Sequence, residues 1–165
     1  MPVEARFDEA LELLARHGVE FIVVGGIAAI LQGSPLTTQD LDVLYRTGQA
    51  NLRRLAEVLD EMDASYADPA GRAIRPDVDR LASMRVHLLT TRYGRVDLMR
   101  SVGHDLVYEH LIDRTRELEI GTYRVRVLEL EAIIETKEQA DRPKDRYQLP
   151  FLRQLLAELR RGDEG

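Results

Sequence analysis

The sequence IVVGGIAAILQGSPLTTQDLDV, at residues 22–43, carries the most informative pattern of the chain. It begins with apolar residues, turns at two adjacent glycines and closes on alternating acidic and apolar residues. Apolar runs bounded by glycine and polar clusters favour short strands and helices, and strict alternation favours a half-buried strand. In order along the chain we expect a strand at 21–24, the glycine pair Gly25–Gly26, a helix at 27–31, a loop at 34–39 and a strand at 40–44.

The two aspartates of this stretch, Asp40 and Asp42, are two residues apart on the expected strand. Successive side chains of a strand point to opposite faces, so both carboxylates lie on one face, roughly 6–7 Å apart, while Leu41 and Val43 enter the core. Two like charges repel each other, and they are tolerated where they are solvated or where divalent cations lie between them. The pair alone therefore fits a solvated strand face as well as a metal site.

A third acid of the same kind is Asp97, the only acid in the apolar strand expected at 95–99. If this strand lies beside the strand of Asp40 and Asp42, the Asp97 carboxylate is about 5 Å to the side. Three such carboxylates can hold two metal ions about 3.5–4 Å apart, the arrangement that in-line attack on a phosphorus atom requires. The alternative for Asp97 is a surface acid close to a turn.

The glycine pair offers a place for phosphate. Gly25 and Gly26 lack a Cβ, so at the passage from strand to helix they let phosphate oxygens approach backbone N–H groups. A pair of glycines by itself usually marks a tight turn. Followed 14 residues later by Asp-x-Asp, in a strand–helix–loop–strand context, it is a far more specific pattern.

The basic residues are unusual in kind. Of the 23 basic residues 21 are arginine, and the only lysines are Lys137 and Lys144. A lysine places a compact charge on a phosphate, a role that arginine fills less well. The alternative explanation is GC-biased codon usage together with chance.

The rest of the chain predicts further helices, two hairpins and one long loop. We expect helices at 4–17, 49–62, 104–112, 129–140 and 144–161, hairpins formed by 84–90 with 95–99 and by 115–120 with 123–128, a loop at 63–83 and fraying of the last residues, RRGDEG. This order indicates an α+β fold with a mixed β-sheet flanked by helices and a C-terminal helical tail. Residues 1–100 would form the core that carries the acids, and residues 101–165 would add a hairpin and helices packed on it as one compact unit.

The composition excludes several classes of protein. The chain has 165 residues, 44% of them hydrophobic and 32% charged, which is the balance of a globular protein. It has no cysteine, which excludes disulfides, thiolate nucleophiles and cysteine-ligated metal centres. A net charge of −6 argues against a broad surface for duplex nucleic acid. No HExxH, GxSxG, Walker A or GxGxxG pattern is present, so zinc-peptidase, serine-hydrolase, P-loop and Rossmann folds are not indicated.

Neither a membrane segment nor a secretory signal is predicted. The longest nearly unbroken apolar run, residues 21–31, has eleven residues, too few to cross a bilayer. The first ten residues, MPVEARFDEA, lack a basic stretch followed by an apolar one. We expect a cytoplasmic protein without a membrane partner.

The two informative regions resemble the signature of the nucleotidyltransferase fold, the DNA polymerase β-like superfamily. More narrowly, they resemble the small bacterial nucleotidyltransferases of the abortive-infection toxin type, which read roughly GGxAxxxxGxxRxTxDhDh and, near the C-terminus, KxxAxRxKDxxD. This chain has GGIAAILQGSPLTTQDLDV at 25–43 and KEQADRPKDRYQ at 137–148. The first region matches at Gly25, Gly26, Ala28, Gly33, Thr38, Asp40 and Asp42. The resemblance extends over about residues 3–156, and both lysines fall within the second motif.

The resemblance implies transfer of a nucleoside monophosphate from a nucleoside triphosphate (NTP) to an acceptor hydroxyl, with two Mg²⁺ ions as the expected cofactors. It implies that Asp40, Asp42 and Asp97 are catalytic and bind metal, with Asp97 also helping to deprotonate the acceptor. The nucleotide-binding residues that it implies are Gly25, Gly26, Thr38, Lys137 and Lys144.

The acceptor is open at this point. The resemblance favours an RNA end, tRNA especially, or a protein hydroxyl, and a toxin with a cognate antitoxin as protein partner. A small molecule such as an aminoglycoside is the alternative, since a negatively charged protein suits a cationic acceptor. A catalytically silent nucleotide- or partner-binding module is the third hypothesis. It rests on two departures from the motifs, Leu36 in place of arginine and Gln148 in place of an acid.

Overall fold

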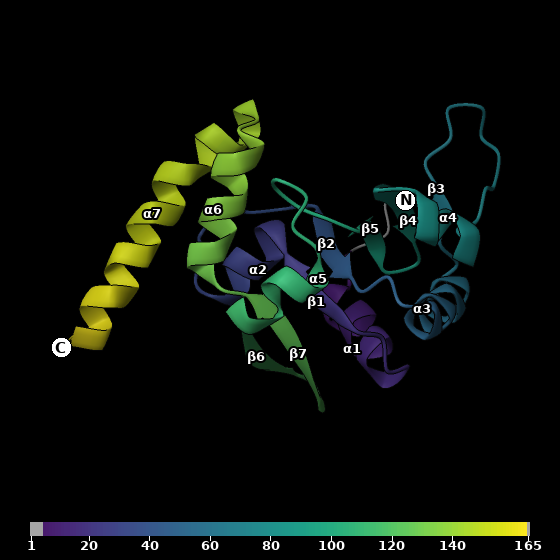
Figure 1. The fold of residues 1–165 in the computed structure, drawn as a ribbon, viewed down its shortest axis with the longest axis horizontal. Helices are drawn as coiled ribbons and strands as arrows, with labels where there is room; N and C mark the ends of the chain where they lie inside the picture. Colours follow the sequence, from purple (N-terminus) through teal and green to yellow (C-terminus); the bar gives the residue numbers. More distant parts are fainter. Residues whose placement is uncertain (1–4, 165) are drawn as a thin grey trace.

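A computed structural model describes residues 5–164 as a mixed sheet with helices around it (Figure 1). The α+β architecture with a C-terminal helix agrees with the prediction. The elements in chain order are α1 (Phe7–Arg16), β1 (Phe21–Val24), α2 (Gly25–Leu31), β2 (Asp40–Tyr45), α3 (Gln49–Glu61), β3 (Ser65–Tyr66), α4 (Val78–Ser83), β4 (Val86–Thr91), β5 (Gly94–Met99), α5 (Tyr108–Leu111), the 3₁₀ helix η1 (Ile112–Arg114), β6 (Thr115–Ile120), β7 (Tyr123–Leu128), α6 (Leu130–Ala140) and α7 (Pro143–Glu164).

One sheet joins strands from both ends of the chain. Its order is β3-β4-β5-β2-β1-β7-β6. The central strand β2 is antiparallel to β1 and parallel to β5, and β1 is in turn parallel to β7. The two hairpins, β4–β5 and β6–β7, extend the sheet on either side of this centre. The sheet therefore brings β1, β2 and β5 side by side at its middle, although β5 follows β2 by about 50 residues of chain.

The alternation in β2 decides which face of the sheet carries chemistry. Leu41 and Val43 are fully buried, whereas Asp40 and Asp42 are half-buried on the opposite face. The apolar side belongs to a continuous core that includes all four residues of β1 and the inner faces of α1 and α3. Burial of these aliphatic side chains contributes roughly 1.5–3 kcal/mol each, which makes the sheet centre the rigid part of the fold.

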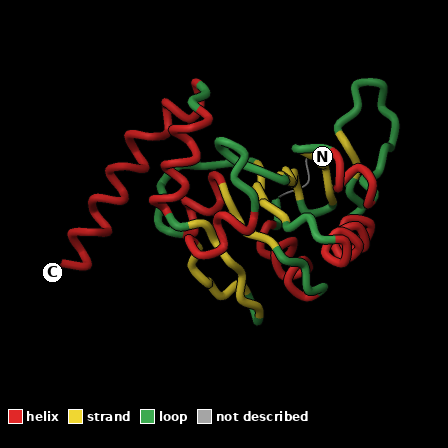
Figure 2. The backbone as a smooth tube through the Cα atoms, viewed as in Figure 1, coloured by secondary structure: helices red, strands yellow, loops and turns green. Residues whose placement is uncertain are grey.

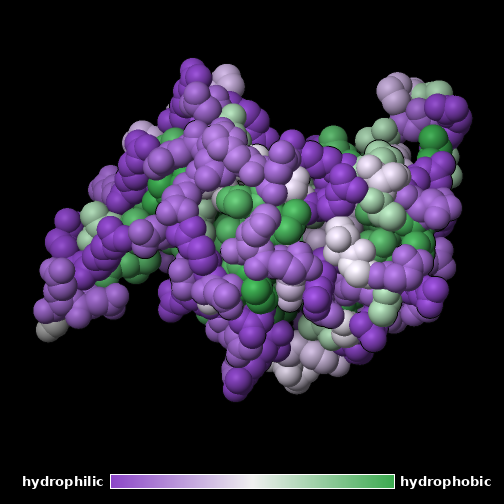
Figure 3. All heavy atoms as spheres, in the orientation of Figure 1, coloured by the Kyte–Doolittle hydropathy of each residue, from purple (hydrophilic) through white to green (hydrophobic). Residues whose placement is uncertain are grey.

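The helices form two groups. Helix α3 contacts both α1 and α4, while α6 contacts both α2 and α7. In Figure 1 the first group lies below and to the right of the central strands, and the second lies to their left. Figure 3 shows a mainly hydrophilic surface on this side of the molecule, with apolar atoms near α6 and α7 and around β4.

The region expected as a loop at 63–83 contains regular structure at both ends. Strand β3 pairs with β4, and α4 begins after Asp77, whose side chain accepts a hydrogen bond from the Arg80 backbone N–H. Such an N-cap stabilises a helix by about 1 kcal/mol, which favours helix formation in this short segment. Between β3 and α4 the chain is a projecting loop, as predicted (Figure 2).

Two smaller expectations also differ from the structure. The expected helix at 104–112 is shorter, with α5 restricted to Tyr108–Leu111 and followed by η1. Helix α7 runs through Pro150 to Glu164, so the last residues, expected to fray, are helical as far as Glu164. Within residues 5–164, no helix has the length and apolar character needed to cross a membrane.

Candidate active site

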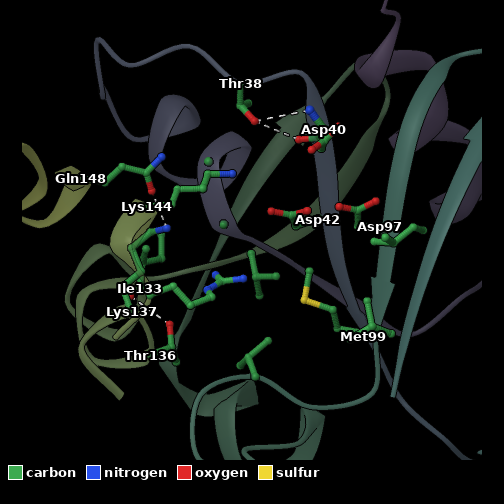
Figure 4. A pocket seen from close by; sticks show the side chains of 17 residues that line it. Thr38, Asp40, Asp42, Asp97, Met99, Ile133, Thr136, Lys137, Lys144 and Gln148 are labelled. Carbon is green, nitrogen blue, oxygen red and sulfur yellow. Dashed lines mark hydrogen bonds between the residues drawn. The ribbon is translucent and has the colours of Figure 1, made fainter. Parts of the chain in front are cut away.

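A pocket opens on the acidic face of the sheet, between the strands and the ends of α6 and α7 (Figure 4). Its cavity of about 210 Å³ is smaller than the roughly 300–1,000 Å³ of typical small-molecule sites, so it would enclose only part of a nucleotide. Every predicted site residue lines it: Asp40, Asp42, Asp97, Gly25, Gly26, Thr38, Lys137 and Lys144.

The register of the parallel pair β2–β5 places Asp42 directly beside Asp97. The condition on which the role of Asp97 depended, that the two strands are neighbours, is therefore met, and Figure 4 shows the two carboxylates facing each other. Burial, followed by the charges of Asp97 and Asp40, raises the pKa of Asp42 to about 7. Burial and the charge of Asp40 also raise the pKa of Asp97. This concentration of negative charge is what a cation would relieve.

Asp40 lies at the rim of the same pocket. Its Oδ1 is 3.3 Å from the Arg95 Nε, without the geometry of a hydrogen bond. Asp40 Oδ1 and Asp97 Oδ1 are buried and lack a hydrogen-bond partner. Buried polar atoms normally have a hydrogen-bond partner, so these two carboxylate oxygens have acceptor capacity that the protein leaves unused and that a cation could satisfy.

The three acids are not already arranged as a closed metal site. Across the described part of the chain, no group of three or more His, Cys, Asp or Glu side chains has the arrangement of a metal centre. The structure instead brings Asp42 and Asp97 together and leaves Asp40 beside Arg95. The donor set is nevertheless suitable for a hard divalent cation, because carboxylate oxygens are the ligands that Mg²⁺ prefers.

Position 25 requires glycine, because any side chain there would collide with the Asp42 carboxylate. Its φ is +68°, and a Cβ at this position would lie 3.0 Å from the Asp42 Cγ and closer still to one carboxylate oxygen. A Cβ on Gly26 would lie 3.0 Å from the Thr38 Cβ. Because α2 begins at Gly25 itself, both glycines are at the pocket wall, where the absent side chains leave the backbone open to a ligand.

Thr38 shapes the start of β2. Its hydroxyl donates to the Asp40 carbonyl at 3.3 Å and accepts from the Asp40 backbone N–H at 3.4 Å. The side chain thus orients the strand end that carries Asp40. Thr38 lies at the pocket wall, and the only side-chain hydrogen bonds that it makes within residues 5–164 are these two to the Asp40 backbone.

The two lysines have different surroundings. The Lys137 ammonium donates to Gln148 Oε1 at 2.8 Å and lies 3.5 Å from Asp145 Oδ1. Burial lowers the pKa of Lys137, and the charge of Asp145 opposes that shift. Lys144 makes no ion pair or side-chain hydrogen bond within residues 5–164, and Figure 4 shows it extending toward the carboxylates. Among the basic residues that line the pocket, Lys144 is therefore the one that is free to bind an anionic ligand.

Asp145 is a central residue that sequence reasoning underestimated. It follows Lys144 in the second motif and lies in the first turn of α7. It is also fully buried, and it accepts hydrogen bonds from the Arg142 Nε at 2.8 Å and from the Arg142 backbone N–H at 3.1 Å. Burial alone would raise the pKa of Asp145, but the hydrogen bonds from Arg142 lower it. Asp145 thereby ties Arg142 and Lys137 together.

Two further groups were missed. Gln148, regarded as a departure from the motif, accepts the hydrogen bond from Lys137, and Leu36 lines a small hollow beside it. The opposite wall of the pocket is apolar, with Val86, Leu88 and Met99. The signal for this wall was present in the sequence, because strand 84–90 has apolar residues at both alternating sets of positions.

Residues 4–162 match the family described as "Nucleotidyl transferase of unknown function (DUF2204)". The chain belongs to this family. It is a nucleotidyltransferase, as the glycine pair and the acids indicate. Among curated proteins none matches it in sequence.

Solved structures of nucleotidyltransferases share the fold. The lincosamide antibiotic adenylyltransferase LnuA, solved with lincomycin bound, superposes with a TM-score of 0.61 at 11% identity, over 93% of this chain and 99% of that one. ANT(2″)-Ia, in complex with adenylyl-2″-tobramycin, gives 0.58 at 15% identity, over 93% and 87%. An antigenic nucleotidyltransferase-like protein from Paracoccidioides brasiliensis gives 0.51 at 17% identity, over 88% and 72%. At these identities the likeness concerns the fold.

Proposed function

We propose that this nucleotidyltransferase moves a nucleoside monophosphate from an NTP to an acceptor hydroxyl in the pocket between β2, β5 and α6–α7. The observation that carries the proposal is the facing pair Asp42–Asp97, with Asp40 and the unpaired Lys144 in the same pocket. A cluster of acidic side chains alone would be compatible with many kinds of binding site. Acids opposite a free lysine match a substrate that combines a metal-bound phosphate with further anionic oxygens.

The residues suited to hold Mg²⁺ are Asp40, Asp42 and Asp97. The oxygens Asp40 Oδ1 and Asp97 Oδ1, which lack a hydrogen-bond partner, support this assignment together with the raised pKa of Asp42. When bound, the metal would lower the pKa of the acceptor hydroxyl and neutralise charge on the phosphates.

The chain's own residues supply binding and proton transfer. Lys144, and behind it Lys137, would hold the triphosphate, while Gly25 and Gly26 leave room for its oxygens. We assign to Asp97 Oδ1, which is buried and without a hydrogen-bond partner, the acceptance of the acceptor's proton. The bond from the α-phosphorus to the bridging oxygen breaks as the bond to the acceptor oxygen forms, and pyrophosphate leaves toward the lysines.

Two classes of acceptor are supported by different observations. The motifs of the first region and of residues 137–148 support an RNA end, tRNA especially, or a protein hydroxyl, in a toxin with an antitoxin partner. The fold shared with LnuA and ANT(2″)-Ia supports a small-molecule hydroxyl, since their structures hold lincomycin and adenylylated tobramycin. Growth arrest on expression in a sensitive host is expected for the first class, and drug resistance without arrest for the second.

The proposed transfer is tested with NTPs labelled at the α-phosphorus, Mg²⁺ and a cell lysate. We expect the wild-type chain to label a component of the lysate, and Asp42→Asn to reduce the rate by about 100-fold or more, the typical effect of losing an essential catalytic charge. Glu119→Gln, on the exposed strand β6, is the matched control and should leave labelling unchanged. Labelling that persists in Asp42→Asn, or no labelling by wild type with any NTP, contradicts the proposal.

A further inference from the structure

The pocket wall opposite the lysines is an exposed apolar surface. Strand β4 alternates exposed and buried residues, and its outward side chains Val86 and Leu88 are 41% and 49% exposed. Val86 pairs with Met99 and Leu88 with Asp97 across the β4–β5 ladder. We call Val86, Leu88 and Met99 the β4–β5 shelf. An apolar surface that continues directly into a cluster of carboxylates is costly to leave in water, which is typical of a ligand-binding surface.

Charge limits what the shelf can bind. The outward side chains of the two strands are Val86, Leu88, Thr90, Arg95, Asp97 and Met99. Asp97 is the only acid among them. Its neighbours Asp40 and Asp42 on β2 are the acids suited to hold the metal. A polycationic acceptor would need carboxylates beyond these three for its ammonium groups, and β4 and β5 offer none on this face.

A phosphate-rich acceptor is also poorly matched. Arg95 lies within ion-pair distance of Asp40, and Arg85 is hydrogen-bonded to Ser101 and to the Gly103 carbonyl. Arg95 and Arg85 are therefore engaged with the protein. Binding of an RNA backbone depends on several cations that are free to replace its counterions.

The direction of the reaction places the acceptor at the shelf. In-line displacement requires the attacking oxygen to approach the phosphorus opposite the leaving group. With pyrophosphate leaving toward Lys144, the acceptor hydroxyl approaches from the side of Asp97, and the rest of the acceptor then lies over Leu88 and Val86. We propose that the β4–β5 shelf is the acceptor subsite and that it selects an uncharged, apolar-bodied small molecule bearing a hydroxyl. This inference rests on the proposed transferase function.

The test uses the full chain with a non-hydrolysable ATP analogue, Mg²⁺, and methyl, n-butyl and n-octyl β-D-glucoside as uncharged hydroxyl probes below their micelle-forming concentrations. Isothermal titration and NMR of the methyl groups give affinity and location. We expect affinity to rise with alkyl length, by up to about fourfold per buried methylene, and the Leu88 methyl signals to shift. Tobramycin, as a polycationic probe, is expected to bind no better than methyl glucoside.

Substitutions separate the shelf from the nucleotide site. Leu88→Gln should abolish the dependence on chain length and leave the affinity for the ATP analogue within about twofold of wild type. Leu159→Gln, at an exposed leucine of α7, is the matched control. It should change neither the dependence on alkyl length nor the affinity for the ATP analogue. A similar response of both variants would indicate non-specific adsorption and overturn the inference.

The other outcomes are also decisive. Affinity that is independent of chain length, or tighter binding of tobramycin or of a short single-stranded RNA to the shelf, overturns the inference while the transferase function stands. Weakened binding of the ATP analogue by Leu88→Gln overturns it as well, because the shelf would then hold the nucleobase. Failure of wild type to bind the analogue contradicts the proposed function itself.

Discussion

Position 25 shows how closely one residue can be constrained by a neighbour. Gly25→Ala adds a Cβ in a left-handed conformation and against the Asp42 carboxylate. We expect a loss of about 1–3 kcal/mol in the free energy of unfolding and a loss of activity larger than that loss explains, because Asp42 must move. Gly26 does not have a positive φ, and an added Cβ there would contact only Thr38. Gly26→Ala should therefore reduce both the free energy of unfolding and the activity by less than Gly25→Ala does. Urea denaturation and labelling rates measure the two effects, and equal effects at the two positions would contradict the explanation.

The two lysines should respond differently to substitution. Lys144→Ala removes an unpaired cation, so we expect NTP affinity to fall by about 10- to 100-fold with little change in stability, as for a charged hydrogen bond of about 1.5–3 kcal/mol. Lys137→Ala leaves the buried Asp145 with Arg142 as its remaining partner and should cost about 1–3 kcal/mol of stability. Calorimetric titration of NTP and urea denaturation distinguish them. Arg146→Ala, on the exposed side of α7, is a suitable control for NTP affinity.

For single residues, the sequence identified the acids and the glycines that line the pocket but not the contacts that support them. The spacing of Asp40 and Asp42 follows from the period of a strand, which requires no knowledge of the rest of the fold. The bond from Lys137 to Gln148, and the burial of Asp145, depend on how α6 packs against α7. No local pattern reports that packing, which is why Gln148 was interpreted as a mere departure from a motif.

Strand β4 is anchored on its inner side by a buried histidine. His87 Nδ1 lies 2.7 Å from the Tyr66 hydroxyl and Nε2 lies 3.0 Å from that of Tyr45, which donates to the Leu81 carbonyl at 2.7 Å. Since the Tyr45 proton is used on Leu81, Nε2–H donates to Tyr45 and Nδ1 accepts from Tyr66. With a neutral ring, both His87 nitrogens and both tyrosine hydroxyls have a hydrogen-bond partner, and the network connects β2, β3 and β4.

This network makes stability depend on pH. Burial lowers the pKa of His87 below its ordinary value of about 6.5, so the unfolded chain binds the extra proton more readily. The contribution of His87 is complete above pH 6.5 and is lost as the pH falls toward the lower folded pKa. We expect urea midpoints to decrease between pH 7 and pH 5, and His87→Gln to reduce this decrease while lowering stability at pH 7. An unchanged pH slope in the variant would contradict the explanation.

Among the elements, the hairpins were predicted more closely than the long connections. The β6–β7 boundaries agree with the prediction, because a glycine turn between two alternating runs is a local signal. Helix α4 was missed, since its start depends on a single capping contact from Asp77. The parallel pairing of β2 with β5 was only a conditional expectation, because strand neighbours that are distant in sequence are not encoded locally.

For the whole molecule, one sheet joins the two expected regions of the chain. The expected core of residues 1–100 contains β1, but β1 pairs with β7 along its other edge, so the sheet continues through both regions. We propose that residues 1–100 and 101–165 fold as one unit. A fragment of residues 1–100 should therefore lack a cooperative urea transition, because the unpaired edge of β1 and the apolar residues beneath β7 would be exposed. Circular dichroism during denaturation measures this, and a cooperative transition in the fragment would contradict it.

The order of the pocket residues along the chain has a consequence for synthesis. Of these residues Gly25 and Asp42 emerge first from the ribosome, Asp97 follows, and Lys144 comes last, within the first turn of α7. A nascent or truncated polypeptide thus carries the carboxylates without their cationic counterpart. Translation must have passed the first turn of α7 before the pocket can be assembled, so products that stop before Lys144 should be inert.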